Sequence, residues 1–409
     1  MLPSMSPNFR LFLSGAGIIG ILILALFLIP KIPSDILEPT TQTASNASVT
    51  GIAPEDTLII APAEFPASST PKNAEVAADE ATTSEQAKSL PATTKKEPEP
   101  EPKEDVKVQG DSDVMRVQNP YSSPPLPFSR VNEEARAALV NILCGARNGS
   151  LRPVSGSGVI IDPRGVILTN SHVAQYVLLA SDPQVDLSCV IRSGSPARPH
   201  WSAEVLYIPT IWVKEHANDI NTTRPLGTGE HDYALLRING ALINSQLPHS
   251  FPYLSPDTRD AIGFVDDQVL VASYPAEFIG GITTQLDLYP ASSITTIKSL
   301  LTFANKTVDL LSIGGVIEAQ SGSSGGALVN EWGRLIGIIS TTSEGTTTAQ
   351  RDLRAITLSY INRDILAQNG SDLPTILEGD VIAQAHDFNE TEAPELIRIL
   401  IEHISGRSR

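Results

Sequence analysis

The strongest constraint on the fold of this chain is a series of short apolar segments separated by turn residues. Each segment is rich in Val, Ile and Leu and is bounded by Gly, Pro, Asn or Asp, as β-strands usually are. The predicted strands comprise residues 139–144, 156–161, 165–169, 185–192, 203–207, 233–238, 268–273, 311–318, 335–340 and 353–359. No amphipathic helical pattern alternates with them, which argues against a parallel α/β sheet. An all-β domain, either an antiparallel barrel or a sandwich, is therefore expected.

A longer apolar run, residues 11–29, lies outside this region and contains no charged residue. As an α-helix it would measure about 29 Å, which matches the hydrocarbon core of a bilayer. A cleaved signal peptide would have a shorter apolar centre and a small-x-small site, and residues 29–33 (IPKIP) match this poorly. We expect an uncleaved transmembrane anchor, with residues 1–10 in the cytoplasm and the remaining chain on the extracytoplasmic side of the cell envelope.

Residues 30–125 have the composition of a disordered linker. They are rich in Ala, Thr, Pro and Glu and nearly free of aromatic residues, and residues 97–105 (EPEPEPKED) are the extreme case. Such a segment cannot bury enough apolar surface to fold. We expect an acidic, Pro-rich tether, with an acidic interaction tail as the alternative. The net charge of −17 also argues against a nucleic-acid partner, which needs clustered Lys and Arg.

A folded domain is expected over residues 126–370, where about 240 residues are ample for two small barrels. A short capped helix is predicted near residues 132–136, just before the first strand. The remaining chain, residues 371–409, is predicted to be a helical tail, because the apolar residues of 393–404 recur with a helical period. We expect this helix to dock on the barrels, and a partner-binding helix is the alternative.

Residues 320–328 (QSGSSGGAL) place a run of small residues between two apolar runs. Glycines allow a sharp turn, and they leave the N–H groups of Gly322 and Ser324 free to face a developing oxyanion. A Gly-x-Ser-Gly-Gly sequence is how a serine hydrolase presents its nucleophile, which here would be Ser324. A flexible Gly/Ser turn is the alternative interpretation.

A serine nucleophile needs a base, and the base needs a group that orients it. His172 lies just past the predicted strand 165–169, at a rim position that can face a cleft. Asp232 opens the predicted strand 233–238, where a buried acid can accept hydrogen bonds from a histidine. Taken singly, each has an ordinary interpretation, as a surface histidine and a turn aspartate.

In this order, the motifs resemble the trypsin/chymotrypsin-like serine proteases, and in particular the HtrA (Deg) branch. The resemblance covers roughly residues 130–365 and is carried by residues 156–161 (GSGVII), 169–173 (TNSHV), 232–236 (DYALL), 322–328 (GSSGGAL) and 335–338 (LIGI). It implies a chymotrypsin-like fold of two antiparallel barrels of the six-stranded type. It also implies that His172 is the general base, Asp232 its orienting acid and Ser324 the nucleophile, with an oxyanion hole at the N–H groups of Gly322 and Ser324.

The sequence departs from the family pattern in three places. The residue before the nucleophile is Ser323, not the acid that pairs with a newly cut N-terminus in digestive proteases, so a zymogen switch of that kind is not expected. After the barrels, too few residues remain for the PDZ domain typical of HtrA proteins. The segment between His172 and Asp232 is also longer than in HtrA proteins, and we expect residues 209–230 to form a loop over the cleft. His216 and His231 lie near this segment but not in the sequence context of the base.

The Ser324 loop could also be the nucleophile turn of an α/β-hydrolase, because residues 322–326 satisfy the Gly-x-Ser-x-Gly pattern of that fold. In that fold the serine joins a strand to a helix, and the histidine follows it in the sequence. Here a strand is predicted after the loop, and the only downstream histidines are His386 and His403, in the tail. The order and the β-rich context reject this alternative.

The chain has two cysteines, Cys144 and Cys189, in no metal-binding or redox spacing, and its seven histidines are scattered singly. No metal or cofactor is therefore expected. In an exported domain the two cysteines could form a disulfide worth about 4 kcal/mol of stability. Two buried free thiols are the alternative.

Two segments bear on substrate preference. By the resemblance, Ser340, Thr341 and Thr342 should line the substrate strand, because a peptide docks there by β-augmentation. Residues 318–321 should border the primary pocket, where Glu318 could favour a basic side chain or point away.

Two functions are consistent with these observations. The first is a membrane-anchored, extracytoplasmic serine endopeptidase acting on polypeptide substrates. The second is a catalytically silent protease-fold domain that binds peptides as a sensor or adaptor. The ordered triad motifs favour the first.

Overall fold

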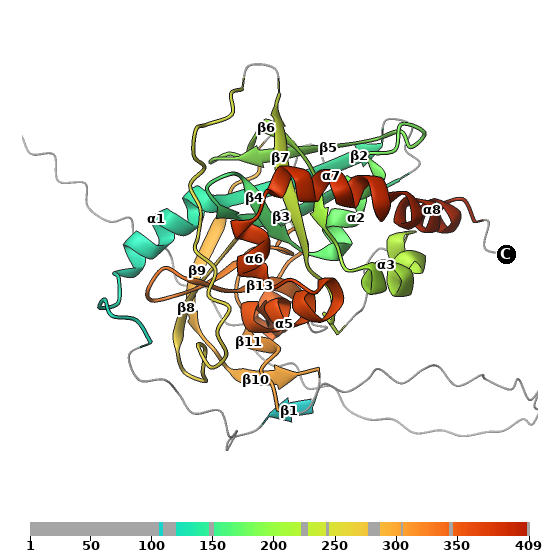
Figure 1. Cartoon of the computed structure of the whole chain (residues 1–409). Helices are drawn as coiled ribbons and strands as arrows, with labels where there is room; N and C mark the ends of the chain where they lie inside the picture. Colours follow the sequence, from blue (N-terminus) through green and yellow to red (C-terminus); the bar gives the residue numbers. More distant parts are fainter. Residues whose placement is uncertain are drawn as a thin grey trace, which may run out of the picture. The chain divides into compact units, whose positions relative to one another are not determined.

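The computed structural model describes residues 106–108, 120–146, 151–221, 228–242, 245–276, 287–303, 306–342 and 347–406. The predicted anchor, residues 11–29, lies outside these described residues, as does most of the predicted linker. Among the helices that the structure describes, none is long and apolar enough to cross a membrane. The account below concerns the folded domain (Figure 1).

The first sheet is a closed antiparallel barrel with the strand order β2-β3-β4-β7-β6-β5. Its strands are β2 (Leu139–Ala146), β3 (Val154–Asp162), β4 (Val166–Thr169), β5 (Leu187–Ser193), β6 (Arg198–Tyr207) and β7 (Ala234–Ala241). Alternate apolar residues such as Val140, Ile160 and Leu236 are buried in a common core. The short apolar runs of the sequence therefore predict the six strands of this barrel, and β3 and β4 are buried along most of their length.

The second sheet has eight strands in the order β1-β10-β11-β14-β13-β12-β8-β9 and forms a curled half-barrel. Its strands are β1 (Val106–Val108), β8 (Gln268–Ser273), β9 (Ala291–Thr296), β10 (Ser299–Thr302), β11 (Leu310–Gly314), β12 (Ala327–Asn330), β13 (Leu335–Thr342) and β14 (Leu353–Thr357). All the strand pairs of this sheet are antiparallel. The expected all-β, chymotrypsin-like architecture is confirmed, with one sheet closed and the other open.

The folded part extends further toward the N-terminus than predicted. Strand β1 falls within the range assigned to the linker, yet it pairs with β10. Tyr121, also within that range, donates a hydrogen bond from its hydroxyl to Asp257 at 2.6 Å and packs against Trp332. The predicted short helix at 132–136 is confirmed as the centre of α1 (Phe128–Ala138).

Helices also occupy segments where the sequence predicts none. Residues 209–230, expected to be a loop, begin with α3 (Thr210–His216) and the 3₁₀ helix η1 (Ala217–Asn221). The prediction failed there because Trp212 and Val213 are buried in the first-barrel core, which stabilises a short helix. Helix α2 (Ser171–Leu179) follows β4, and the 3₁₀ helix η2 (Thr348–Gln350) precedes β14.

The C-terminal region contains four helices where one was predicted. They are α5 (Leu358–Asn369), α6 (Leu373–Glu378), α7 (Val381–Thr391) and α8 (Ala393–Ile404). Side chains of Thr357, Asp372 and Asp380 cap the first three, and the Thr357 cap ends β14 two residues before the predicted strand end. Helix α7 packs on β6, and α8 packs on α2, α3 and η1 (Figure 1). The docked helix at 393–404 is thus confirmed.

Candidate active site

The strand register of the first barrel brings His172 and Asp232 together. Strands β4 and β7 are neighbours, with Thr169 opposite Ala234, so the chain leaving β4 meets the chain entering β7. His172 is the second residue of α2, and Asp232 lies two residues before β7. The amide of Asn170 donates to the Asp232 carbonyl at 2.7 Å and fixes the two segments against each other.

The side chains of His172 and Asp232 form a hydrogen-bonded pair. The His172 Nδ1 lies 2.8 Å from Asp232 Oδ2, and the His172 backbone N–H donates to Oδ1 at 3.0 Å. The Ser340 hydroxyl, from β13, donates to the same Oδ2 at 2.8 Å. The carboxylate is almost completely buried, while the imidazole keeps 21% of its side-chain surface exposed. The Asp232 carboxylate therefore accepts hydrogen bonds from His172 and from Ser340 of the second sheet, while the His172 imidazole remains partly exposed to solvent.

The Ser324 loop has a backbone that requires glycine at two points. Gly322 and Gly325 have φ angles of 93° and 83°, in the left-handed region that other residues rarely adopt. A Cβ on Gly325 would lie 2.1 Å from the Ser157 carbonyl oxygen, and one on Gly322 would lie 2.8 Å from the Tyr274 carbonyl oxygen. The glycines of the motif are thus explained by close contact with β3 and with the end of β8.

Both sheets hold this loop in place. From β3, the Ser157 N–H donates to the Ser324 carbonyl at 2.7 Å, and the Ser157 hydroxyl donates to the Gly322 carbonyl at 2.7 Å. From β13, the Ile339 carbonyl accepts from the Gly325 N–H at 2.8 Å, one residue before Ser340. A continuous chain of contacts therefore connects the Ser324 loop to Asp232 and His172. Among the described residues, no hydrogen bond joins the Ser324 hydroxyl to the imidazole, a contact that often tightens only on substrate binding.

Comparison with known families fits this arrangement. Residues 156–338 match the family model described as trypsin-like peptidase domain. The chain contains a trypsin-like peptidase domain. A solved structure similar to it is the serine endoprotease from Yersinia pestis, with 22% identity and a TM-score of 0.38 over 61% of this chain and 70% of that one. A comparison with curated proteins gave no match.

Within the peptidase domain, His172 and Asp232 shift each other's pKa values. Burial by itself lowers the pKa of His172, but the charge and hydrogen bond of Asp232 outweigh it, so the pKa is raised above its ordinary value. Burial would raise the pKa of Asp232, yet the His172 contacts and the Ser340 hydroxyl bring it below its ordinary value. Each partner thus stabilises the charged form of the other. An ionised Asp232 accepts the Nδ1 proton, which leaves Nε2 to act as the acceptor.

The two backbone N–H groups predicted to form an oxyanion hole belong to the Ser324 loop. Those of Gly322 and Ser324 form no hydrogen bond within the described part of the chain. The carbonyl of Ser321 is turned away from them, because it accepts from the Ala276 N–H at 2.8 Å. The Ser323 hydroxyl, at the position where digestive proteases have an acid, is buried and accepts from Ser273 at 2.9 Å.

The remaining predicted site residues are placed as follows. Ser340 directs its hydroxyl at Asp232, a contact that the sequence did not indicate. The side chains of Thr341 and Thr342 lie outside the described parts of the structure. Glu318 is fully buried: its Oε1 accepts from Ser293 at 2.9 Å, and burial raises its pKa. The rejected base candidate His216 stacks on Trp212.

The cysteines pair across two neighbouring strands of the first barrel. Cys144 of β2 is opposite Cys189 of β5, and a disulfide joins them. The loop of Ser324 leads into strand β12, which agrees with the rejection of an α/β-hydrolase elbow. Ser157 was missed as a site residue, although it lies within the GSGVII motif that carried the resemblance.

Proposed function

We propose that this trypsin-like domain is a serine endopeptidase that uses Ser324, His172 and Asp232 as its catalytic triad. The observation that carries the proposal is the buried Asp232 carboxylate, which accepts from His172 Nδ1 at 2.8 Å and from Ser340 at 2.8 Å. The same strand, β13, binds the loop of Ser324 through Ile339. Nucleophile, base and orienting acid are therefore held by one network, as acyl transfer requires.

In this proposal, Ser324 Oγ attacks the carbonyl carbon of the scissile peptide bond, and its proton passes to His172 Nε2. The N–H groups of Gly322 and Ser324 stabilise the negative oxygen of the tetrahedral intermediate. The intermediate collapses when the C–N bond breaks and His172 donates its proton to the leaving amine. Water, activated in the same way, then hydrolyses the acyl-enzyme and restores Ser324.

The proposal is tested with a fluorophosphonate probe and with casein as substrate. The wild-type chain should be labelled and should cleave casein, and Ser324→Ala should lose labelling and at least about 1,000-fold of the rate. A Ser202→Ala variant is the matched control, because its hydroxyl donates to the exposed Asn239 of β7 at 2.8 Å and has no part in the proposed reaction. Cleavage retained by Ser324→Ala contradicts the mechanism. A wild type that binds peptides but is never labelled favours the sensor or adaptor instead.

We also propose that residues 11–29 form a membrane anchor that holds the domain outside the cytoplasm. The domain would act there as an HtrA-like envelope protease does. The apolar run supports the anchor, and the Cys144–Cys189 disulfide supports an oxidising compartment. Alkylation of unreduced protein from its own cells should leave both cysteines unmodified, and the protein should stay in the membrane fraction at alkaline pH. Two alkylated thiols, or release into the soluble fraction, would contradict this localisation.

A further inference from the structure

The two residues that flank Asp232 are both held by one carboxylate from a distant helix. The distance between Oδ2 of Asp364, in α5, and Nδ1 of His231 is 2.8 Å. The hydroxyl of Tyr233 donates to the same oxygen at 2.7 Å. The sequence separations exceed 130 residues in both cases, so this contact exists only after the two sheets have come together. Asp364 therefore contacts both sequence neighbours of Asp232, the proposed orienting acid.

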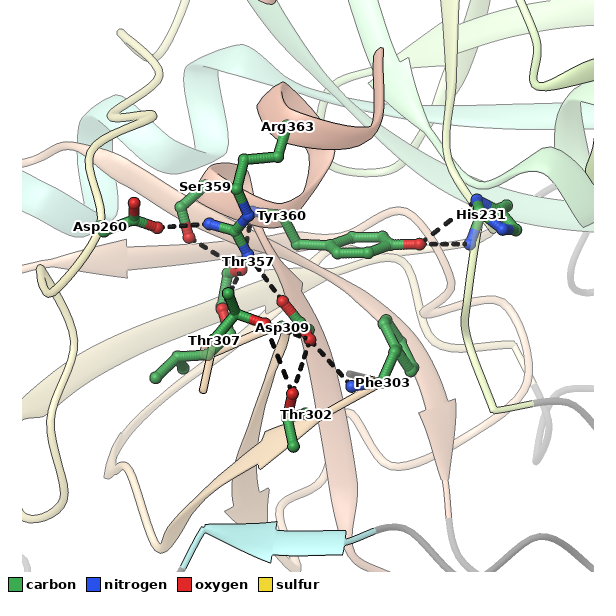
Figure 2. A network of polar contacts seen from close by, with 11 residues as sticks. His231, Asp260, Thr302, Phe303, Thr307, Asp309, Thr357, Ser359, Tyr360 and Arg363 are labelled. Atoms are coloured by element: carbon green, nitrogen blue, oxygen red, sulfur yellow. Dashed lines mark hydrogen bonds and ion pairs between the residues drawn. The ribbon is translucent and has the colours of Figure 1, made fainter. Parts of the chain in front are cut away.

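His231 needs this support because its backbone is in an unfavourable conformation. Its φ of 59° lies in the left-handed region, where a histidine is uncommon. Its N–H donates to the Tyr360 hydroxyl at 3.1 Å, and Figure 2 shows that hydroxyl directed at His231 from α5. The hydrogen bond that His231 donates to the Asp364 carboxylate raises the pKa of His231, and the negative charges nearby add to this effect. Other polar groups beside this contact include Glu230, whose carboxylate lies 3.9 Å from His231 Nε2, and Gln368, whose amide donates to Asp364 at 2.7 Å. The charge of Glu215 also raises the pKa of His231, and the Tyr360 hydroxyl lies 3.3 Å from His231 Nδ1.

The neighbouring residue, Arg363, fixes α5 to the second sheet. It contacts the exposed Asp260 and lies 2.6 Å from Asp309, whose side chain is 2% exposed. Asp309 in turn accepts from Thr302 Oγ1 at 2.9 Å and from the Phe303 N–H at 2.8 Å (Figure 2). Consecutive residues of α5 thus tie the helix to β10 and β11 on one side, and to the segment of Asp232 on the other.

We infer that Asp364 is a positioning residue for the reaction, acting through His231 and Tyr233 to hold Asp232 against His172. The inference rests on the proposed serine endopeptidase function. Asp232 accepts from the His172 N–H, from Nδ1 and from Ser340 only while residues 231–233 keep their path. A displacement of this path by a fraction of an ångström weakens the contact that orients the base. Asp364 itself touches neither Asp232 nor His172 in the described contacts.

The test is Asp364→Asn in the full chain. We expect kcat to fall about 10- to 100-fold with KM within about twofold, because positioning is lost while peptide binding is kept. The pKa of His172, measured by NMR titration of its ring, should fall, because a displaced Asp232 stabilises the imidazolium less. Because the pKa of His172 falls, the rise of kcat/KM with pH should also shift to lower pH in this variant. A purely structural anchor would lower only the melting temperature, so unchanged kcat and unchanged His172 titration would overturn the inference.

Control variants separate position from charge and from folding. Asp260→Asn makes the same acid-to-amide change on the other side of α5, and it should leave kcat and the His172 titration unchanged. His231→Asn tolerates the left-handed backbone but removes the imidazole contact, so it should lower kcat in the same direction even if Asp364→Asn does not fold. Wild-type kcat in folded His231→Asn would then contradict the inference.

The NMR measurement also separates this inference from the proposed function. If the wild type is neither labelled by the fluorophosphonate probe nor active on casein, the proposed function fails. The His172 titration still reports whether Asp364 holds the pair, because it needs no turnover. If the wild type is active but the titration is the same in Asp364→Asn, the inference fails and the proposed function stands.

Discussion

The chemistry proposed for this site depends on the protonation of one side chain, the His172 imidazole. It can accept the Ser324 proton only when it is neutral. Burial lowers its pKa and Asp232 raises it, and the second effect dominates. His172 therefore loses its proton at a higher pH than an ordinary histidine does.

We predict that kcat/KM rises with pH through a midpoint above 6.5, the ordinary value for histidine. The profile should be measured with one peptide substrate between about pH 5 and 9. Removing the Ser340 hydroxyl with Ser340→Ala should raise the pKa of Asp232, because that hydrogen bond lowers it. A midpoint at or below 6.5 in the wild type would contradict the electrostatic account of the pair.

At the scale of elements, the C-terminal helices connect the parts of the fold that form the site. Helix α5 leaves β14 and carries Asp364, while α7 covers β6 and α8 packs on α2. Because α2 begins at Ser171 and has His172 in its first turn, the packing of α8 on α2 also helps to hold His172 in place. Leu400 is fully buried in the shared first-barrel core.

Leu400→Ala should therefore lower the free energy of unfolding by about 2–5 kcal/mol, because it leaves a cavity between α8 and the barrel. Urea denaturation of the purified chain measures this. Leu366→Ala removes the same atoms from α5 at a side chain that is 50% exposed, and it should cost less than about 1 kcal/mol. Equal losses in the two variants would show that α8 is not docked as described.

Ten of the fourteen described strands and the pairing of His172 with Asp232 could be predicted from the sequence. Strands β1, β9, β10 and β12 and the helices α2, α3 and α5–α7 could not. Apolar runs such as 233–238 become strands because their pattern is local, and the motifs around His172 and Ser324 are short and specific. Helices α5–α7 depend on caps such as Thr357 and Asp380, whose residue types also occur in ordinary turns. Asp364 is one acid among many, and only the packing of α5 between two sheets gives it a role.

At the scale of the whole molecule, the site forms where the two sheets meet, and Ser157 is the clearest link between them. Its hydroxyl donates to the Gly322 carbonyl at 2.7 Å and accepts from the Tyr274 N–H at 2.9 Å. It is fully buried on β3 of the first barrel, while both partners belong to the second-sheet region. The Ser324 loop is therefore tied to the barrel that carries His172.

Ser157→Ala should lower the free energy of unfolding by about 1–3 kcal/mol, because two buried polar groups lose their partner. It should also lower kcat, since the Gly322 carbonyl is freed to move. Ser155→Ala, on the same strand, removes a hydroxyl bonded only to Asn141 among the contacts described here, and its kcat should match the wild type. A kcat of Ser157→Ala equal to that of Ser155→Ala would contradict this link.

The hydrogen bond from Ala276 to the Ser321 carbonyl has a consequence for the time course of the reaction. With that carbonyl already engaged, the peptide group between Ser321 and Gly322 is held in one orientation before any peptide arrives. A loop that had to rotate a peptide group after binding would impose an isomerisation step and a lag ahead of acylation. In this molecule the proposed acylation would therefore begin without such a lag.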